Sequence, residues 1–318
     1  MRILITGGFG FIGGRLGQYF SSLGHQVLLG SRSPRAVPDW LPQADVVLTD
    51  WADELSLAHV CEGVDVVVHA AGMVAQECWD NPAAALESNG VFTVRMARAA
   101  GAAGVSRLIY LSTVHVYASP LMGSYSEESC PLNLHPYASS HLAGEHAVLF
   151  AHQQGQVDGM VLRLANGSGC PVRSDVDCWQ LLVNDLCRQS IMDGQMVIHS
   201  NPSLERNFIG VSGICRGVDH FMTYCPLEKE LPLYNIASRE SMSLSDAALL
   251  VAERCRHVTG DSPSVVFEQR SSESGADKAL HIDTEKAKAA GYYAVDSLVS
   301  EIDATLEFCK VHFGRNGG

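Results

Sequence analysis

Short runs of apolar residues alternate with longer amphipathic segments through the first half of the chain. The first run, Arg2–Thr6, predicts a buried strand, and after a glycine-rich turn Phe11–Leu23 predicts a helix that ends at Gly24. Further apolar runs predict strands at Gln26–Leu29, Val46–Leu48, Val64–His69, Leu108–Ser112 and Met160–Leu164. Strands that are apolar throughout and alternate with helices are typical of a parallel sheet covered on both faces. The pattern therefore predicts an α/β fold with a doubly wound parallel sheet of the Rossmann type.

The second half of the chain is less regular. After about Asn166, a loop rich in Gly, Ser, Cys and Pro precedes a predicted helix over Trp179–Met192, and a last helix is predicted from Ser297 to about His312. Short apolar runs predict strands at Met196–His199, Phe208–Val211 and Leu233–Ile236. Residues 314–318 are expected to form a frayed tail.

Length and pattern together predict two domains. The chain has 318 residues, enough for one large domain or two modest ones. We expect residues 1–165 to form the sheet domain and residues 166–318 mainly a smaller second domain. Because segments near 208–240 include predicted strands that return to the sheet, the two domains are expected to be interleaved.

Composition narrows the class of protein. The formal charge of −13 argues against a nucleic-acid or anionic-membrane surface, and no apolar run is long enough to span a bilayer. The chain starts with a strand pattern rather than a signal peptide, and its ten cysteines are scattered without a C-x-x-C pair. Reduced thiols and a cytoplasmic location are therefore expected. No residue spacing matches a zinc site, so no metal is expected.

The turn after the first strand carries candidate chemistry. It reads Gly7-Gly8-Phe9-Gly10-Phe11-Ile12-Gly13. Glycines at the first, fourth and seventh positions permit a tight turn, approach of the backbone to a pyrophosphate and close helix–strand packing. The following helix offers free amides and a partial positive charge. Between a strand and an amphipathic helix this spacing predicts a dinucleotide site, with a tight turn that binds no ligand as the alternative.

The end of the second strand bears on which dinucleotide is bound. NAD-preferring folds usually place Asp or Glu there, whereas this chain has Ser31 and Arg32. A serine hydroxyl and an arginine charge suit a 2′-phosphate, so NADP(H) is favoured over NAD(H). Asp50 follows the next strand and is a candidate for the adenine amine. The alternative for Asp50 is a cap on the helix that follows.

Several other motifs recur together with the glycine loop in one enzyme family. They are His69-Ala70-Ala71-Gly72, Asn89, Leu111–Tyr117, Tyr137, Arg163–Asn166, Arg206-Asn207-Phe208 and Tyr234-Asn235. With Thr6–Gly13 they resemble the extended short-chain dehydrogenases/reductases, the branch that includes UDP-galactose 4-epimerase, nucleotide-sugar dehydratases and keto-sugar reductases. The resemblance covers nearly the whole chain. It implies a nucleotide-diphosphate sugar as substrate, and cofactor contacts from Gly7, Gly10, Phe11, Ile12, Gly13, Ala70, Ala71, Tyr137 and His141.

The catalytic motif of that family is altered in this chain. The family carries Tyr-x-x-x-Lys, and here the segment is Tyr137-Ala-Ser-Ser-His141, with no lysine before Lys229. The resemblance makes Tyr137 the general acid/base and Thr113 the residue that holds the reacting oxygen. A free tyrosine has a pKa near 10, so acting as a base at pH 7 costs roughly 4 kcal/mol. A histidine of ordinary pKa is mostly neutral at pH 7 and offsets less of this cost than a lysine does.

This substitution affects the two directions of the reaction differently. Reduction of a ketone needs Tyr137 as an acid, which it already is at neutral pH, whereas oxidation needs it as a base. His141 therefore favours reduction; the alternative for His141 is a solvated helix residue in a site that has lost its chemistry. The dehydratases of this family carry an Asp-Glu pair after the threonine, and here the pair is Val114-His115, which disfavours 4,6-dehydration. His115 is either a substitute acid/base or a packed histidine, and His69 is expected to be structural.

The resemblance also assigns the substrate end. Asn166, Arg206 and Arg270 match the positions that bind the diphosphate, a task that suits the planar, permanently charged guanidinium. Asn207 and the pair Ser212-Gly213 stand where the family has Asp. The resemblance further implies a homodimer whose interface is a four-helix bundle of Phe92–Ala103 and Tyr137–Ala151, although the same pattern fits packing within one subunit.

These observations lead to one preferred function and two alternatives. The preferred function is an NAD(P)-dependent oxidoreductase that acts on a nucleotide-activated sugar, with reduction of a keto group favoured. The first alternative is a nucleotide-sugar epimerase with a tightly held cofactor. The second is a catalytically silent protein that binds NADP(H) or a nucleotide sugar.

Overall fold

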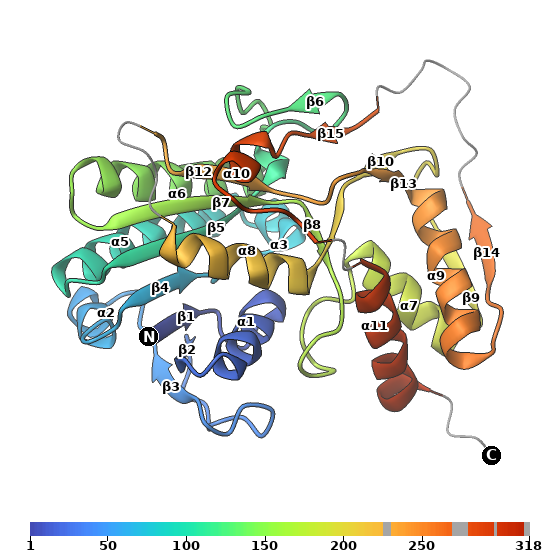
Figure 1. Cartoon of the computed structure of the whole chain (residues 1–318), viewed down its shortest axis with the longest axis horizontal. Coiled ribbons are helices and arrows are strands. Elements are labelled where there is room, and N and C mark those ends of the chain that lie inside the picture. Colours follow the sequence, from blue (N-terminus) through green and yellow to red (C-terminus); the bar gives the residue numbers. More distant parts are fainter. Residues whose placement is uncertain (225–229, 269–278, 296–297, 315–318) are drawn as a thin grey trace.

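Seven parallel strands form the central sheet of the protein (Figure 1). The computed structural model describes residues 1–224, 230–268, 279–295 and 298–314. The strand order is β12-β7-β5-β4-β1-β2-β3. In chain order the strands are β1 (Arg2–Thr6), β2 (Gln26–Ser31), β3 (Asp45–Leu48), β4 (Val66–His69), β5 (Arg107–Thr113), β7 (Asp158–Leu164) and β12 (Leu233–Ile236).

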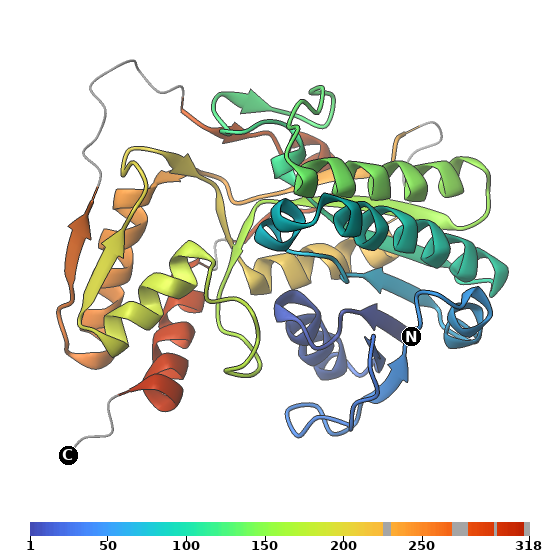
Figure 2. The same ribbon diagram turned by 180° about the vertical axis from the view of Figure 1, so that it is seen from behind.

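Helices cover both faces of this sheet because successive side chains of each strand point to opposite faces. Ile3 and Ile5 of β1 belong to the core beneath α1 (Phe11–Ser22) and α8 (Val211–Thr223). Leu4, between them, belongs to the core on the other face. That face is covered by α2 (Glu54–Val60), α5 (Phe92–Ala102) and α6 (Pro136–Gln153) (Figure 2). The predicted doubly wound α/β fold is confirmed.

A smaller lobe lies beside the sheet (Figure 1). Its helices are α7 (Leu182–Met192), α9 (Leu244–Thr259) and α11 (Leu298–Phe313), which share a core with the two-stranded parallel sheet of β9 (Gln195–Ile198) and β14 (Ser264–Phe267). The chain returns from this lobe to place β12 at the sheet edge, next to β7. The domain boundary near residue 165 stays a prediction.

Short elements connect the two parts. Three small sheets pair β8 (Asn166–Ser168) with β11 (Phe208–Gly210), β10 (Glu205–Arg206) with β13 (Met242–Ser243), and β6 (Ser124–Tyr125) with β15 (His281–Ile282). The other helical segments are α3 (Ala75–Asp80), α4 (Pro82–Ala85), the π-helical turn η1 (Leu86–Val91), the 3₁₀ turn η2 (Val114–Val116) and α10 (Glu285–Ala289).

One buried carboxylate ties the lobe to the sheet. Glu301 of α11 accepts hydrogen bonds from Arg15 Nη2 of α1 at 2.9 Å and from the Ser212 amide of α8 at 3.0 Å. Its other oxygen accepts from the Cys170 amide at 3.2 Å. A charge taken out of water this way is stable only while its partners stay in place. Glu301 therefore holds the loop after β8 against the helix that starts at the glycine turn.

The boundaries predicted from the sequence agree with the structure to within two residues, except at the start of one helix. The helix predicted from Trp179 begins at Leu182, because Trp179 is used in the preceding loop, where its Nε1 donates to the Ser174 carbonyl at 3.0 Å. The last helix is described from Leu298, since Ser297 and residues 315–318 lie outside the described residues. In the part of the chain that the structure describes, no helix combines the length and apolar character needed to span a membrane.

Candidate active site

The loop between β1 and α1 leaves no room for side chains. Gly7 has a left-handed backbone (φ +66°), and a Cβ atom there would lie 2.9 Å from Ala71 Cα. At Gly13 a Cβ atom would lie 2.2 Å from the Gly7 carbonyl oxygen, which also accepts from the Gly10 amide at 2.9 Å. Within the described residues no side chain caps the amino end of α1. Its first amides are thus available to an anion, and the loop fits a dinucleotide pyrophosphate.

The residues predicted to flank the cofactor lie around this loop. Phe11 is buried in an apolar cluster with Val176 and Cys178, so the loop after β8 covers the amino end of α1. Ile12 packs against the same cluster. Ala70 and Ala71 follow β4 and are half-buried, and the Ala71 amide donates to Thr6 Oγ1 at 3.2 Å. Their contact with a cofactor stays a prediction.

Arginines gather near Phe9, beside the end of β2. The Arg35 guanidinium lies over the Phe9 ring, 4.8 Å from its centroid, and Arg173 lies 6.0 Å from the same centroid. Arg32 is exposed. Ser31 is buried, and its Oγ donates to the Ser33 carbonyl at 2.7 Å, so its proton is used within the loop. Sequence reasoning missed Arg173, because it reaches this place from beyond β8.

Asp50 is exposed and does not cap the following helix. Its Oδ1 accepts from the Ala52 amide at 3.0 Å. The cap on α2 is Asp53, whose side chain accepts from the Leu55 amide at 2.9 Å. The alternative interpretation of Asp50 as the cap is therefore wrong, because the helix starts three residues later than that interpretation requires. Its contact with adenine stays a prediction.

Thr113 and Tyr137 come together where β5 ends and α6 begins. Thr113 is buried at the end of β5. Tyr137 lies in the first turn of α6, which starts with Pro136 and is capped by His135, whose Nδ1 accepts from the Tyr137 amide at 3.1 Å. Burial raises the pKa of Tyr137 to about 12, and a hydrogen bond with the Thr113 side chain opposes the rise. Tyr137 is accordingly a proton donor at neutral pH.

His141 lies one turn further along α6 and is only 7% exposed, so it is not a solvated helix residue. Its ring packs edge-on against Tyr137, with centroids 4.5 Å apart. Its Nδ1 lies 2.9 Å from the hydroxyl of Tyr110. Burial lowers the pKa of His141 to about 4. The imidazole is therefore neutral at pH 7 and supplies no charge to Tyr137.

The buried carboxylate of Glu145, on the same face of α6, neutralises the charge of Arg163. Glu145, one turn after His141, accepts from Arg163 Nε at 2.9 Å and Nη2 at 2.6 Å, and from Ser112 Oγ at 2.6 Å. This bidentate pair is internally neutral. It joins α6 to β5 and β7 and leaves Tyr137 without a compensating positive charge from Arg163.

Polar groups behind Tyr137 form a buried network that sequence reasoning only partly anticipated. Asn89, on the π-helical turn, donates to Ser140 Oγ at 2.9 Å and accepts from the Met73 amide at 2.8 Å. His69 is bonded through both ring nitrogens, to Thr6 Oγ1 at 2.7 Å and to Thr93 Oγ1 at 3.1 Å. His69 therefore has the structural role expected of it.

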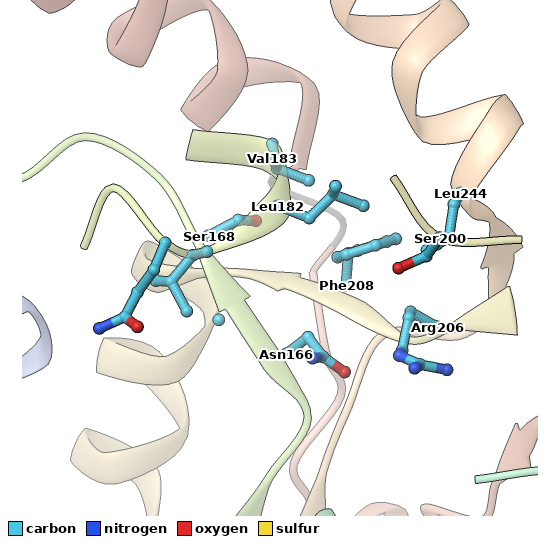
Figure 3. Close-up of a pocket in the computed structure, with 11 residues that line it drawn as sticks. Asn166, Ser168, Leu182, Val183, Ser200, Arg206, Phe208 and Leu244 are labelled. Atoms are coloured by element: carbon cyan, nitrogen blue, oxygen red, sulfur yellow. The ribbon is translucent and has the colours of Figure 1, made fainter. Parts of the chain in front are cut away.

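A cavity of about 250 Å³ lies where β8, β10 and β11 meet the first residues of α7 and α9 (Figure 3). It is lined by Asn166, Gly167, Ser168, Gln180, Leu181, Leu182, Val183, Ser200, Arg206, Phe208 and Leu244. Arg206 is half-buried, its Nη1 donates to the Glu205 carbonyl at 2.9 Å, and no described carboxylate forms an ion pair with it. A half-buried cation without a counter-charge favours an anionic ligand. Arg270 lies outside the described residues.

His115 connects the cavity to the catalytic end. Its Nε2 lies 3.3 Å from the side-chain nitrogen of Asn166, and its carbonyl accepts from Asn133 Nδ2 at 2.7 Å. Burial, with a smaller contribution from the charge of Arg206, lowers the pKa of His115 to about 4. His115 is thus a neutral, hydrogen-bonded residue located between Thr113 and Arg206.

The model of the NAD dependent epimerase/dehydratase family matches residues 3–237 of this chain. The chain belongs to this family. Among relatives, it is 36% identical over 180 residues to dTDP-6-deoxy-L-talose 4-dehydrogenase (NAD(P)(+)) of Kitasatospora kifunensis, covering 54% of this chain and 55% of that one. It is 30% identical over 233 residues to dTDP-glucose 4,6-dehydratase of Streptomyces niveus, covering 69% and 68%. The chain thus spans about half the length of the first relative and two thirds of the second.

A solved structure shows the same fold. The UDP-glucuronic acid 4-epimerase of Bacillus cereus, in complex with UDP-glucuronic acid and NAD, superposes with a TM-score of 0.78 over 98% of this chain and all of that one. The two sequences are 23% identical. At that identity the similarity establishes the fold and not the activity.

The resemblance leads us to expect Asp at position 207 and at the pair 212-213. Asn207 is buried, and its side-chain amide is fully hydrogen-bonded to its surroundings. Its Oδ1 accepts from the Ser238 amide at 2.9 Å, and its Nδ2 donates to the carbonyls of Ser238 at 3.0 Å and Glu240 at 3.3 Å. A carboxylate cannot donate to those two carbonyls. At the pair 212-213, the Ser212 amide donates to Glu301.

Proposed function

We propose that this member of the family is an NADP(H)-dependent reductase of a keto group on a nucleotide-diphosphate sugar. The observation that carries the proposal is the pairing of a Tyr137 whose pKa is about 12 with a neutral His141. At pH 7 the phenol holds its proton, which is the state that reduction requires. Removing that proton, as oxidation requires, costs roughly 7 kcal/mol at a pKa of about 12.

The residues of the site then have distinct roles. When bound, the cofactor supplies the hydride that reduces the carbonyl carbon. Tyr137 Oη donates its proton to the carbonyl oxygen, and the Thr113 hydroxyl holds that oxygen in place. His141 orients the cofactor ribose through a ring N–H. Tyr137 afterwards regains its proton from solvent, which is favourable at neutral pH because of its raised pKa.

The surroundings of Phe9 support a preference for NADP(H). Strand β2 ends without a carboxylate, and Arg35 and Arg173 converge on the Phe9 ring while Arg32 is exposed at the strand end. Guanidinium groups bind a 2′-phosphate through charge-assisted hydrogen bonds. Because the Ser31 hydroxyl is bonded within the loop, we assign the phosphate to the arginines, of which Arg173 also pairs with Asp175.

The cavity supports a nucleotide-sugar substrate. Asn166 and Arg206 provide an amide and a half-buried cation for a diphosphate, and the relatives named above act on dTDP-sugars. The Val114-His115 pair disfavours dehydration, because His115 is neutral and hydrogen-bonded to Asn166. An epimerase is disfavoured for the reason given above, since each of its cycles begins with an oxidation that needs Tyr137 as a base.

The exposed apolar residues of the α5–α6 side support a homodimer. Val91, Val94 and Phe150 are each more than 40% exposed, although their side chains are large and hydrophobic. A second copy of the chain that covers them removes this surface from water. Light scattering of the purified protein tests the proposal, and a monomer at micromolar concentration contradicts it.

NADPH oxidation against a panel of nucleotide 4-keto-sugars tests the reductase. We expect turnover by the wild type and a fall in kcat of about a thousandfold in Tyr137→Phe, because positioned proton donors contribute 10²–10⁴-fold. A wild type that binds NADPH but turns over none of the panel, and gains turnover in His141→Lys, contradicts the proposal and favours a silent binding protein. Cofactor retained through purification together with interconversion of C4 epimers favours the epimerase.

A further inference from the structure

The hydroxyl of Tyr110 is the hydrogen-bonding partner of His141. Tyr110 lies on β5, three residues before Thr113, and is 1% exposed. Its Oη lies 2.9 Å from His141 Nδ1 and 3.4 Å from the carbonyl oxygen of Asn89. A buried tyrosine hydroxyl needs a partner, and His141 Nδ1 and the Asn89 carbonyl are both within reach of this one.

The proton between the two rings belongs to Tyr110. Burial raises the pKa of Tyr110 well above its usual value and lowers that of His141 to about 4, so both groups are neutral. If Nδ1 carried the imidazole proton, the tyrosine proton would have to use the Thr93 side chain or the longer contact to the carbonyl of Asn89. That carbonyl already accepts from Thr93 Oγ1 at 2.7 Å. Donation from Tyr110 to Nδ1 uses the shorter contact, and it leaves the single imidazole proton of His141 on Nε2.

The Cε1 side of the imidazole lies near Gly72, at the carboxyl end of β4. Among the described residues, the hydrogen-bonding contact of the His141 ring is the one at Nδ1. The ring edge lies against Gly72, where an added Cβ atom would be 3.8 Å from His141 Cε1. Gly72 directly follows Ala70 and Ala71 at the carboxyl end of β4, the edge at which doubly wound sheets bind their ligands.

We propose that Tyr110 is a positioning residue: it holds His141 in the Nε2–H tautomer, so that a neutral imidazole offers a hydrogen-bond donor to a cofactor ribose hydroxyl. In the Tyr-x-x-x-Lys motif of the family that the chain resembles, a lysine ammonium occupies this position. It needs no such partner, because it donates in every orientation. The inference rests on the proposed function for the presence of the cofactor, but not for the tautomer.

The tautomer is measurable without cofactor or turnover. Protein labelled with ¹⁵N in the histidine rings gives two-bond ¹H–¹⁵N correlations that distinguish a protonated from an unprotonated ring nitrogen, and His141→Gln identifies the signals of His141. We expect the wild-type proton on Nε2 and an acceptor Nδ1 at pH 7. Tyr292→Phe is the matched control for the substitution Tyr110→Phe, since it removes another buried hydroxyl, one that donates to the Gly213 carbonyl at 3.0 Å. A proton on Nδ1 in the wild type overturns the proposal.

Cofactor binding tests the consequence. Tyr110→Phe keeps the ring and removes the hydroxyl, and we expect NADPH affinity to fall about fivefold, the effect of one ordinary hydrogen bond. In a His141→Lys background we expect the same substitution to change affinity less than twofold, so that the two positions are coupled. An equal loss in both backgrounds means that Tyr110 acts through packing alone, which overturns the proposal. So does unchanged affinity in Tyr110→Phe.

The failure of this inference is distinguishable from failure of the reductase. The expected tautomer and coupling without turnover of any keto-sugar leave the role of Tyr110 standing and overturn the proposed reaction. Turnover of a keto-sugar with no coupling between Tyr110 and His141 supports the proposed reaction and overturns the role of Tyr110. If Tyr110→Phe does not fold, the wild-type spectrum alone still decides the position of the proton.

Discussion

The glycine loop at the start of α1 and the first turns of α6 belong to the same candidate site, but they are constrained in different ways. At Gly13 the constraint is steric, since a Cβ atom would lie 2.2 Å from a carbonyl oxygen. At His141 the backbone accepts another side chain, and what changes is charge, because the histidine is buried and its pKa is about 4. The two positions are therefore fixed by different physical causes, backbone contact at Gly13 and burial of an ionisable ring at His141.

The largest effect is expected from a substitution at Gly13, where the constraint is steric. Gly13→Ala places a methyl group against the Gly7 carbonyl, so the loop has to open. We expect NADPH affinity to fall at least a hundredfold, measured by titration calorimetry, because the amides no longer converge on the pyrophosphate. Gly17→Ala is the control on the same helix, since the three atoms nearest its Cβ belong to the side chains of Leu29, Leu41 and Trp40, at 3.1, 3.2 and 3.9 Å. Equal affinities of the two variants for NADPH contradict the steric argument.

The second prediction concerns a positive charge at position 141. His141→Lys introduces an ammonium beside Tyr137, which lowers the cost of forming the phenolate. We expect the ratio of alcohol oxidation to ketone reduction, taken from kcat in each direction, to rise at least tenfold. His141→Gln is the neutral control and should leave that ratio within a factor of about two. A ratio that does not respond to the lysine rules out charge as the difference between this chain and its family.

A smaller effect is expected at the rim of the cofactor site. Arg173→Ala removes one of the arginines beside Phe9. We expect affinity for NADPH to fall about fivefold and affinity for NADH to stay the same, because only NADPH carries the 2′-phosphate. Arg98→Ala, at an exposed arginine paired with Glu54 on α2, is the control. Equal losses for both cofactors show that Arg173 does not contact the phosphate.

No effect at all is expected from pH over a wide range. Tyr137 has a raised pKa of about 12, so its proton is present below that value, and His141 has a lowered pKa of about 4, so its ring is neutral above that value. We therefore expect kcat for reduction to be independent of pH between about 5 and 10. In His141→Lys the rate of reduction should decline toward the alkaline end, because the phenol loses its proton earlier. A wild-type profile with a step near neutral pH contradicts the assignment of a neutral His141.

The sheet was predictable because its strands are apolar throughout and short. The strand predicted at Met160–Leu164 corresponds to β7, whose residues 159–164 are all buried. The irregular parts were not predictable in the same way. Neither the π-helical turn at Leu86–Val91 nor the pairing of β6 with β15 leaves a periodic signal, since each depends on contacts with distant segments.

The residues of the candidate site were also only partly predictable from the sequence. Tyr137 and Thr113 were named from local motifs, and the structure brings them together at the start of α6. Tyr110 and Arg173 were not named. Tyr110 gave no local signal, because its role depends on the packing of α6 against β5. Arg173 reaches Phe9 only because the loop after β8 folds back over α1.

The order of strands and helices in the sheet half, the glycine loop and the Tyr137–His141 segment could be identified from the sequence, because each depends on neighbouring residues. What His141 is able to do depends on the tertiary structure. Its neutrality follows from burial between β5 and α6, and its partner Tyr110 is thirty-one residues away. Burial and charge depend on which segments pack together, and no local pattern encodes that.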